Sequence, residues 1–240
     1  MIFKVTKDFN EMSAKAFEIM KGVVKNSPYA VLGLATGTTP LGLYRHMIED
    51  HKAHGTSYQH IRAVNLDEYK GLPKTHPQSY AYFMRENLFR HLDIEESNTY
   101  IENGMAPSEA EECARYNKLL SEMPRDIQLL GLGSNGHIAF NEPNTPFGSE
   151  THVVNLTENT IKDNARLFSN ISEVPRKAFT MGIKQIMQAK QILILASGKN
   201  KADAVYNTVC GKVTEEVPAS ILQLHPNYIL IADNEAVSRL

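Results

Sequence analysis

Short apolar runs alternate with segments of helical spacing along this chain, and that alternation limits the folds open to it. The clearest apolar runs lie at residues 30–34, 61–66, 126–132 and 191–196. Nearly continuous apolar runs of this length are typical of parallel strands that are buried on both faces. Between them, segments such as 41–54 repeat apolar residues at helical spacing. The pattern predicts a Rossmann-like α/β fold with a mainly parallel central sheet, right-handed crossovers and helices on both faces.

The remaining elements continue the alternation. Asp8 is placed as the N-cap of the first helix, and Pro77 and Pro107 each stand at the first turn of a later one. These two later helices are predicted over 77–91 and 107–122. Further strands are predicted at 2–5, 151–156, 178–181 and 228–231, and further helices at 182–189 and 201–209. No repeat or linker-like change in composition interrupts the sequence, so we expect one domain over residues 1–240.

Composition and charge exclude several classes of protein. Of the 240 residues, 42% are hydrophobic and 22% are charged, as in ordinary globular domains, and the formal net charge is -2. That balance disfavours nucleic-acid binding through bulk charge, although it leaves room for a local basic pocket. The two cysteines, Cys113 and Cys210, lack the spacing of a zinc site, and no apolar segment suits a signal peptide or a membrane span. We therefore expect a cytoplasmic protein that binds no metal, nucleic acid or membrane.

Loops that follow the strands are the candidates for a functional site, because ligands of a parallel sheet bind beyond the carboxyl ends of its strands. Residues 35–40, Ala-Thr-Gly-Thr-Thr-Pro, form a small hydroxyl-rich turn before a helix. Backbone N–H groups and the helix dipole suit such a turn to a phosphate, although the spacing of a P-loop is absent. The alternative is a tight turn that only caps the helix.

The strand at 61–66 runs directly into two acidic residues, Asp67 and Glu68. Neighbours on an extended chain point to opposite sides, so we expect only one of them to face a cleft. A carboxylate at the carboxyl end of a strand is well placed as a general base. The alternative is that both residues cap the following turn.

The glycine-rich loop at 131–143 carries the most information. His137 follows Gly136 directly, and Asn135 and Glu142 are close in sequence. An imidazole exchanges protons near neutral pH, so His137 is a candidate proton carrier that Glu142 could orient or balance in charge. The alternative is a hydrogen-bonded structural histidine. The glycines also match a dinucleotide fingerprint, but they lie in the middle of the chain rather than in its first βα unit.

Basic residues near two of these loops are candidates for holding a phosphate. Lys199 and Lys201 follow the strand at 191–196, and Arg166 lies further upstream. A lysine or arginine there suits a charged hydrogen bond to a phosphate oxygen. The alternative for each is a solvated surface cation.

Taken together, these segments resemble the glucosamine-6-phosphate deaminases, within the wider family of glucosamine/galactosamine-6-phosphate isomerases and 6-phosphogluconolactonases. The resemblance is carried by residues 35–40, 65–69, 71–73, 76–80, 131–143, 201–205 and 220–226. The run Gly-His-Ile-Ala-Phe-Asn-Glu-Pro at 136–143 is the most specific part. Lactonases of the same fold typically continue Gly-His with Thr-Ala-Ser-Leu-Phe-Pro, so the resemblance implies a deaminase.

The resemblance implies that D-glucosamine 6-phosphate and water are converted to D-fructose 6-phosphate and ammonia without a cofactor. Asp67 is then similar to the base that moves a proton between C2 and C1, and His137 to the group that opens the sugar ring. Glu142 is similar to the partner of His137, and Asn135 completes this set where many relatives have Asp. Lys201 is favoured over Lys199 at the phosphate. The implied phosphate-binding residues are Thr36, Gly37, Thr38, Thr39, Arg166 and Lys201.

Activation by an effector is not expected from the same resemblance. Hexameric bacterial members are activated by N-acetylglucosamine 6-phosphate through basic residues after the Asn-Glu-Pro run and a longer C-terminal tail. This chain has His152 and Val154 in that region and ends at Leu240. We therefore expect no such activation, and a monomer or small homo-oligomer.

Two other functions stay open. A 6-phosphogluconolactonase would share the fold and the phosphate grip, but it would need no base at C2. A sugar-phosphate sensor would want a DNA-binding module, for which the α/β pattern leaves no residues, and it would tolerate loss of the acid–base groups.

Overall fold

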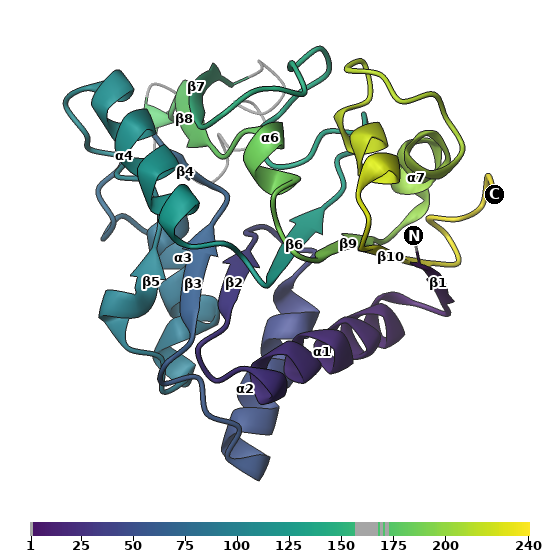
Figure 1. The fold of residues 1–240 in the computed structure, drawn as a ribbon, viewed down its shortest axis with the longest axis horizontal. Coiled ribbons are helices and arrows are strands. Elements are labelled where there is room, and N and C mark those ends of the chain that lie inside the picture. Colours follow the sequence, from purple (N-terminus) through teal and green to yellow (C-terminus); the bar gives the residue numbers. More distant parts are fainter. Residues whose placement is uncertain (1, 157–167, 169, 171–172) are drawn as a thin grey trace.

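Seven parallel strands form the central sheet of the protein. The computed structural model describes residues 2–156, 168, 170 and 173–240. Within these residues the sheet has the order β1-β10-β9-β6-β2-β3-β5, and every neighbouring pair is parallel (Figure 1). Its strands are β1 (Ile2–Thr6), β2 (Val31–Leu34), β3 (Arg62–Asn65), β5 (Thr99–Tyr100), β6 (Ile127–Gly131), β9 (Ile192–Ala196) and β10 (Tyr228–Asp233). The predicted α/β fold with a parallel sheet is confirmed.

Strand burial explains why the apolar runs could be recognised. Every residue of β2, β9 and β10 is buried, and so are four of the five residues of β6. Strands covered on both faces need apolar side chains on both faces, which gives continuous apolar runs rather than alternation.

Helices cover both faces of this sheet. In Figure 1, α1 (Phe9–Asn26) and α2 (Leu41–His54) lie below it, and α4 (Glu109–Glu122), α6 (Ile183–Ile186) and α7 (Ala202–Val209) lie above it. Asp8 is the N-cap of α1, and its side chain accepts a hydrogen bond from the Glu11 backbone N–H at 3.0 Å. The helix α3 (Tyr80–Asn87) packs beside α2. None of the helices in the described ranges is both long enough and apolar enough to cross a bilayer.

Two predicted helix starts were wrong by two or three residues, for the same physical reason. Serine side chains, not prolines, cap these helices: the Ser79 hydroxyl accepts from the Tyr82 N–H, and the Ser108 hydroxyl accepts from the Glu111 N–H. A serine N-cap satisfies a free N–H group at the helix end, which a proline cannot do. The helix predicted to His91 also ends at Asn87 and is followed by a 3₁₀ turn over Phe89–His91.

A second, smaller sheet was not predicted. It is antiparallel, has the order β4-β8-β7, and consists of β4 (Asp67–Tyr69), β8 (Lys177–Thr180) and β7 (His152–Asn155). A backbone hydrogen bond from Met181 N to Leu66 O, 2.7 Å long, joins the end of β8 to the residue between β3 and β4. This sheet carries the acidic pair of the 65–69 segment, so it contributes directly to the site described next.

Candidate active site

The strand order changes direction between β2 and β6, and a cavity of about 270 Å³ lies where their loops meet. At such a switch point the loops diverge to opposite faces and leave a crevice for a ligand. Both glycine-containing loops predicted from the sequence border it. The cavity is lined by Ala35, Thr36, Gly37, Thr38, Thr39, Leu66, Asp67, Tyr80, Gly131, Leu132, Gly133, His137, Ala139, Phe140 and Lys201. Seven of the predicted site residues therefore share one cavity.

Asp67 occupies the first position of β4 and is 6% exposed. Burial disfavours the charged carboxylate and raises the pKa of Asp67 to about 8, and the adjacent Glu68 contributes in the same direction. A carboxyl group with a pKa near the working pH both accepts and returns protons efficiently. The environment of Asp67 thus suits a general base.

Glu68 points away from this cavity, as strand alternation predicts. Its carboxylate accepts three backbone hydrogen bonds, from Tyr69 N at 2.7 Å, Tyr80 N at 2.9 Å and Ala81 N at 2.8 Å. Burial raises the pKa of Glu68 to about 7, and these hydrogen bonds oppose that increase. Glu68 therefore fixes the start of α3 and, with it, the position of Tyr80 in the cavity wall.

His137 is held by two polar side chains that do not themselves line the cavity. Its Nδ1 lies 2.7 Å from Asn135 Oδ1 and 3.5 Å from Glu142 Oε1, and Asn135 Nδ2 donates to Glu142 Oε2 at 2.7 Å. Both neighbours of Nδ1 are acceptors, so we assign its proton to Nδ1, which leaves Nε2 as the acceptor. The hydrogen bond with His137 lowers the pKa of Glu142 despite its partial burial. Glu142 therefore stays charged beside the imidazole.

Gly133 is required for the position of this imidazole. A Cβ atom at Gly133 would lie 2.4 Å from Cε1 and Nδ1 of His137, closer than any packed contact allows. Gly136 has a φ of +86°, and Ala139, which lines the cavity, has a φ of +52°. Asn141 holds this turn, because its Nδ2 donates to the carbonyls of Ile138 and Met181, both at 2.9 Å. The loop is thus built to present the His137 side chain.

The predicted anion-binding segment lies on the same cavity. Thr36, Thr38 and Thr39 precede α2, and Gly37 between them has a φ of +87°. Lys201 is half-buried, and desolvation lowers its pKa, whereas Lys199 is exposed and does not line the cavity. Hydroxyl groups, backbone N–H groups and a partly desolvated ammonium together form a suitable site for a phosphate.

Two of the other predicted residues do not line the cavity, and one falls outside the structure's described residues. Asn135 and Glu142 contact His137 rather than the cavity itself. Arg166 lies within 157–167, which is not described. Within the described ranges, no three His, Cys, Asp or Glu side chains are arranged to hold a metal ion.

Tyr80 and Phe140 form an aromatic wall that the sequence analysis did not assign to the site. Their rings are stacked, with centroids 6.1 Å apart and an interplanar angle of 7°. The Tyr80 hydroxyl donates to the Tyr69 hydroxyl at 3.2 Å. The sequence signal that could have indicated them is their position: Tyr80 follows the helix-capping Ser79, and Phe140 lies in the same loop as His137. Aromatic faces of this kind pack well against the C–H face of a sugar.

Comparison with known proteins shows the family to which this chain belongs. The profile of the family described as glucosamine-6-phosphate isomerases/6-phosphogluconolactonase matches residues 7–230. The chain is 50% identical over 235 residues to the glucosamine-6-phosphate deaminase of Thermoanaerobacter pseudethanolicus, which covers 98% of this chain and 93% of the relative. The chain belongs to the glucosamine-6-phosphate isomerase/6-phosphogluconolactonase family.

Two solved structures resemble this chain to different degrees, one in both fold and sequence and the other in fold alone. A structure of a monomeric glucosamine-6-phosphate deaminase matches with a TM-score of 0.95 and 47% identity, covering 99% of each chain. The 6-phosphogluconolactonase of Trypanosoma brucei matches with a TM-score of 0.80 and 20% identity, covering 100% of this chain and 98% of that one. The second likeness establishes a shared fold, whereas the first extends to sequence over the whole chain.

Proposed function

We propose that this enzyme is a glucosamine-6-phosphate deaminase that converts D-glucosamine 6-phosphate and water to D-fructose 6-phosphate and ammonia. The observation that carries the proposal is the placement of Asp67 and His137 on one cavity with the Thr36–Thr39 loop and Lys201. A proton transfer at C2, a proton carrier for the ring oxygen and a site for the phosphate are what this reaction needs. The relatives with that name at about half identity support the same choice.

Ring opening is the task of His137 in this proposal. Nε2 takes the proton of the anomeric hydroxyl while the ring C1–O5 bond breaks, and the proton is delivered to O5. Charged Glu142 and the Asn135 amide stabilise the transient imidazolium through Nδ1. Where a carboxylate replaced Asn135, one more negative charge would favour the imidazolium, so the amide leaves Glu142 as its principal counter-charge.

Isomerisation is the task of Asp67. In the open-chain aldehyde, the carboxylate removes the C2 proton while O1 is protonated, and an enolamine forms. The same group returns its proton to C1 while the nitrogen loses one proton, which replaces the one gained by O1. The C2 amine thereby becomes a ketimine with no net change in hydrogen. Water adds to C2 of the ketimine, ammonia leaves from the carbinolamine, and the ketose remains. Atoms balance without an external reductant or oxidant.

The phosphate contributes orientation rather than chemistry. Interactions with the Thr36–Thr39 loop and Lys201 supply binding energy remote from the reacting carbons and place C2 against Asp67. Arg166 is proposed as a further ligand of the phosphate. We also propose that the enzyme acts as a monomer or small homo-oligomer, is cytoplasmic, and needs no cofactor.

One paired assay tests this function. The purified enzyme is given glucosamine 6-phosphate, and ammonium and fructose 6-phosphate are measured separately; 6-phosphogluconolactone is supplied in a parallel reaction. We expect both products in equal amounts, no accelerated loss of the lactone, and no turnover by Asp67→Asn. The matched control is Asp203→Asn, because Asp203 is exposed and pairs with Arg239. Lactone hydrolysis without ammonium release would reject the proposal in favour of the lactonase.

A further inference from the structure

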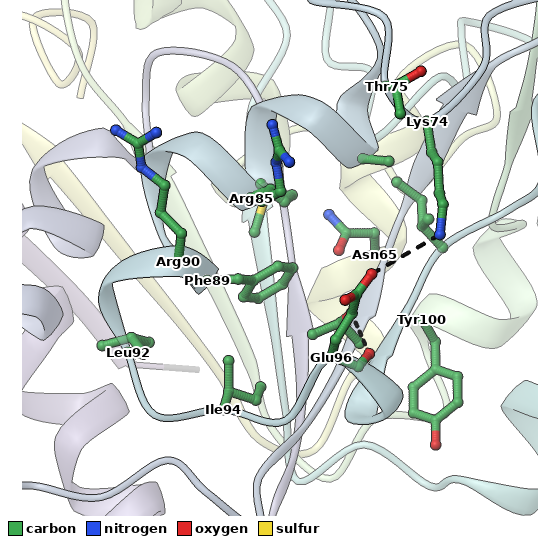
Figure 2. A pocket seen from close by; sticks show the side chains of 14 residues that line it. Asn65, Lys74, Thr75, Arg85, Phe89, Arg90, Leu92, Ile94, Glu96 and Tyr100 are labelled. Atoms are coloured by element: carbon green, nitrogen blue, oxygen red, sulfur yellow. Dashed lines mark hydrogen bonds and ion pairs between the residues drawn. The ribbon is translucent and has the colours of Figure 1, made fainter.

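A second and larger cavity, of about 500 Å³, lies outside the proposed active site (Figure 2). It is bordered by α3, by the 3₁₀ turns that follow α3, and by the ends of β3 and β5. Its size falls within the range of small-molecule sites, roughly 300–1,000 Å³. It is lined by Asn65, Lys74, Thr75, Ala81, Met84, Arg85, Phe89, Arg90, Leu92, Ile94, Glu96, Thr99, Tyr100 and Ile101. The proposed reaction uses none of these residues.

The lining of this cavity combines a group of apolar side chains with a buried amide. Met84, Phe89, Leu92 and Ile94 supply apolar surface, and Figure 2 shows the Asn65 side chain between Phe89 and the end of Lys74, beside Glu96. Asn65 is 1% exposed, and its Nδ2 has no hydrogen-bond partner. The apolar side chains offer contact surface to the apolar body of a ligand, so the polar end of that ligand is sought at the mouth of the cavity.

The mouth of the cavity carries an excess of positive charge. Arg85 and Arg90 are more than half exposed there, and both pair with the same carboxylate, that of Glu86. Lys74 lies 3.9 Å from Glu96, a pair drawn as a dashed line in Figure 2. Counting these groups alone, three cations face two anions, so one guanidinium charge is left over. Guanidinium groups bind carboxylates in a two-point geometry.

We propose that this cavity binds a small amphipathic monoanion, an apolar chain or ring that ends in a carboxylate. Its apolar body contacts Met84, Phe89 and Ile94, and its carboxylate pairs with Arg85 and Arg90. The apolar side chains of the lining disfavour a polyphosphate or a free sugar, and the single excess charge favours one negative charge over two or three. A neutral ligand of the same shape loses the ion pair.

Occupancy of this cavity bears on the active site through a shared wall. Tyr80 lines the active-site cavity, and Ala81, the next residue, lines this one. Likewise, Asn65 at the end of β3 lines this cavity, whereas Asp67 at the start of β4 lines the active-site cavity. Glu68 joins the two pairs, because it accepts from the backbone N–H groups of Tyr80 and Ala81. A ligand that moves α3 therefore moves Tyr80 relative to Asp67; this consequence, unlike the binding itself, rests on the proposed function.

Binding is tested with octanoate as the probe. The control is 1-octanol, which has the same chain length but carries no charge. Titration calorimetry gives the affinity, and methyl NMR of Met84 and Ile94 gives the location. We expect octanoate to bind at least about tenfold more tightly than 1-octanol and to shift these methyl signals. The double variant Arg85→Gln/Arg90→Gln should lose about tenfold in octanoate affinity, whereas Arg45→Gln on the exposed face of α2 should stay within about twofold.

Three results would overturn the site: no octanoate binding, equal binding by the double variant, or shifts confined to other methyl groups. Turnover of glucosamine 6-phosphate is measured separately with and without octanoate. A change in KM or kcat that disappears in the double variant supports the coupling through α3. Because binding is read without turnover, an inactive enzyme that still binds octanoate would reject the proposed function alone, and an active enzyme that does not bind it would reject this site alone.

Discussion

The carboxyl group of Asp67 lies in surroundings that oppose its charge. It is buried beside a second acid, Glu68, and among the described residues no cation forms an ion pair with it. A structural carboxylate would be paired or hydrogen-bonded at this depth. The arrangement is therefore unfavourable for the folded chain and favourable for a base that must take up a proton.

The pH dependence of catalysis should follow the ionisation of Asp67. With a pKa of about 8, the ionised fraction grows as pH rises, so kcat/KM should increase about tenfold per unit between about pH 5 and pH 7 and level off above about pH 9. The coupled ammonium assay gives the profile. The control is the Kd of glucosamine 6-phosphate for Asp67→Asn over the same range. A matching rise in that affinity would assign the titration to another group.

Removing this charge should stabilise the fold. The pKa of Asp67 is higher in the folded protein (about 8) than its ordinary value (3.8), so the folded state binds more protons between these values and loses stability as pH rises through them. The loss is at most about 1.4 kcal/mol per pH unit. Asp67→Asn cannot ionise, so its Tm should exceed that of the unaltered enzyme near pH 8 by several degrees, and by much less near pH 4. A Tm difference that does not depend on pH would contradict the assigned burial effect.

Among the elements, the loop at 131–143 depends most on single residues. Asn141 fixes its turn through hydrogen bonds. The absence of a side chain at Gly133 leaves the space that the imidazole occupies. Most of its geometry is local, which is why the sequence alone indicated a site there. The position of Glu142 behind His137, rather than in the cavity, depends on how the turn folds back on itself, and spacing alone did not show it.

Gly133→Ala should impair catalysis by displacing His137. The added methyl group would overlap the imidazole, so we expect kcat to fall by at least about tenfold with a smaller change in KM. Gly148→Ala is the matched control, because a Cβ atom there meets nothing within 4 Å. The His137 ring signals in NMR should shift in the first variant only. Unchanged kcat in Gly133→Ala would mean that His137 moves freely or takes no part.

The helix start at α7 provides a second pair of matched variants. Lys201→Met removes the cation that lines the cavity, and Lys199→Met removes an exposed one two residues earlier. We expect KM for glucosamine 6-phosphate to rise at least about tenfold in the first and to stay within about twofold in the second, since a charged hydrogen bond to phosphate is worth about 1.5–3 kcal/mol. Steady-state kinetics distinguish them. Equal KM values would place the phosphate elsewhere.

At the scale of the whole molecule, features set by neighbouring residues could be predicted from the sequence, and features set by contacts between distant segments could not. The parallel strands were recognised because burial on both faces marks each of them locally. β4 was missed, because Asp-Glu-Tyr becomes a strand only by pairing with β8, more than 100 residues away. Tyr80 was missed as a site residue for the same reason, since Glu68 draws the start of α3 to the cavity. Alternation along the strand nevertheless predicted that only one of Asp67 and Glu68 would face the cavity, and Asp67 is the one that lines it.

The response to an effector is also a property of the whole molecule. His152 and Val154 lie on β7, where the resemblance places basic residues in activated relatives. We expect a hyperbolic rate curve with glucosamine 6-phosphate and less than about twofold change on adding N-acetylglucosamine 6-phosphate, because two cations of an effector site are absent. Light scattering should show a monomer or small oligomer in the same samples. A sigmoidal curve that the acetylated sugar makes hyperbolic would contradict this expectation.

The residues of the proposed site come from both sheets. The threonine loop and Lys201 follow strands of the parallel sheet, whereas Asp67 belongs to the antiparallel one. In the proposed reaction, the group that moves the C2 proton and the groups that hold the anion therefore stand on different sheets, joined at Leu66. A change in the small sheet that alters Asp67 would leave the threonine loop and Lys201 in place.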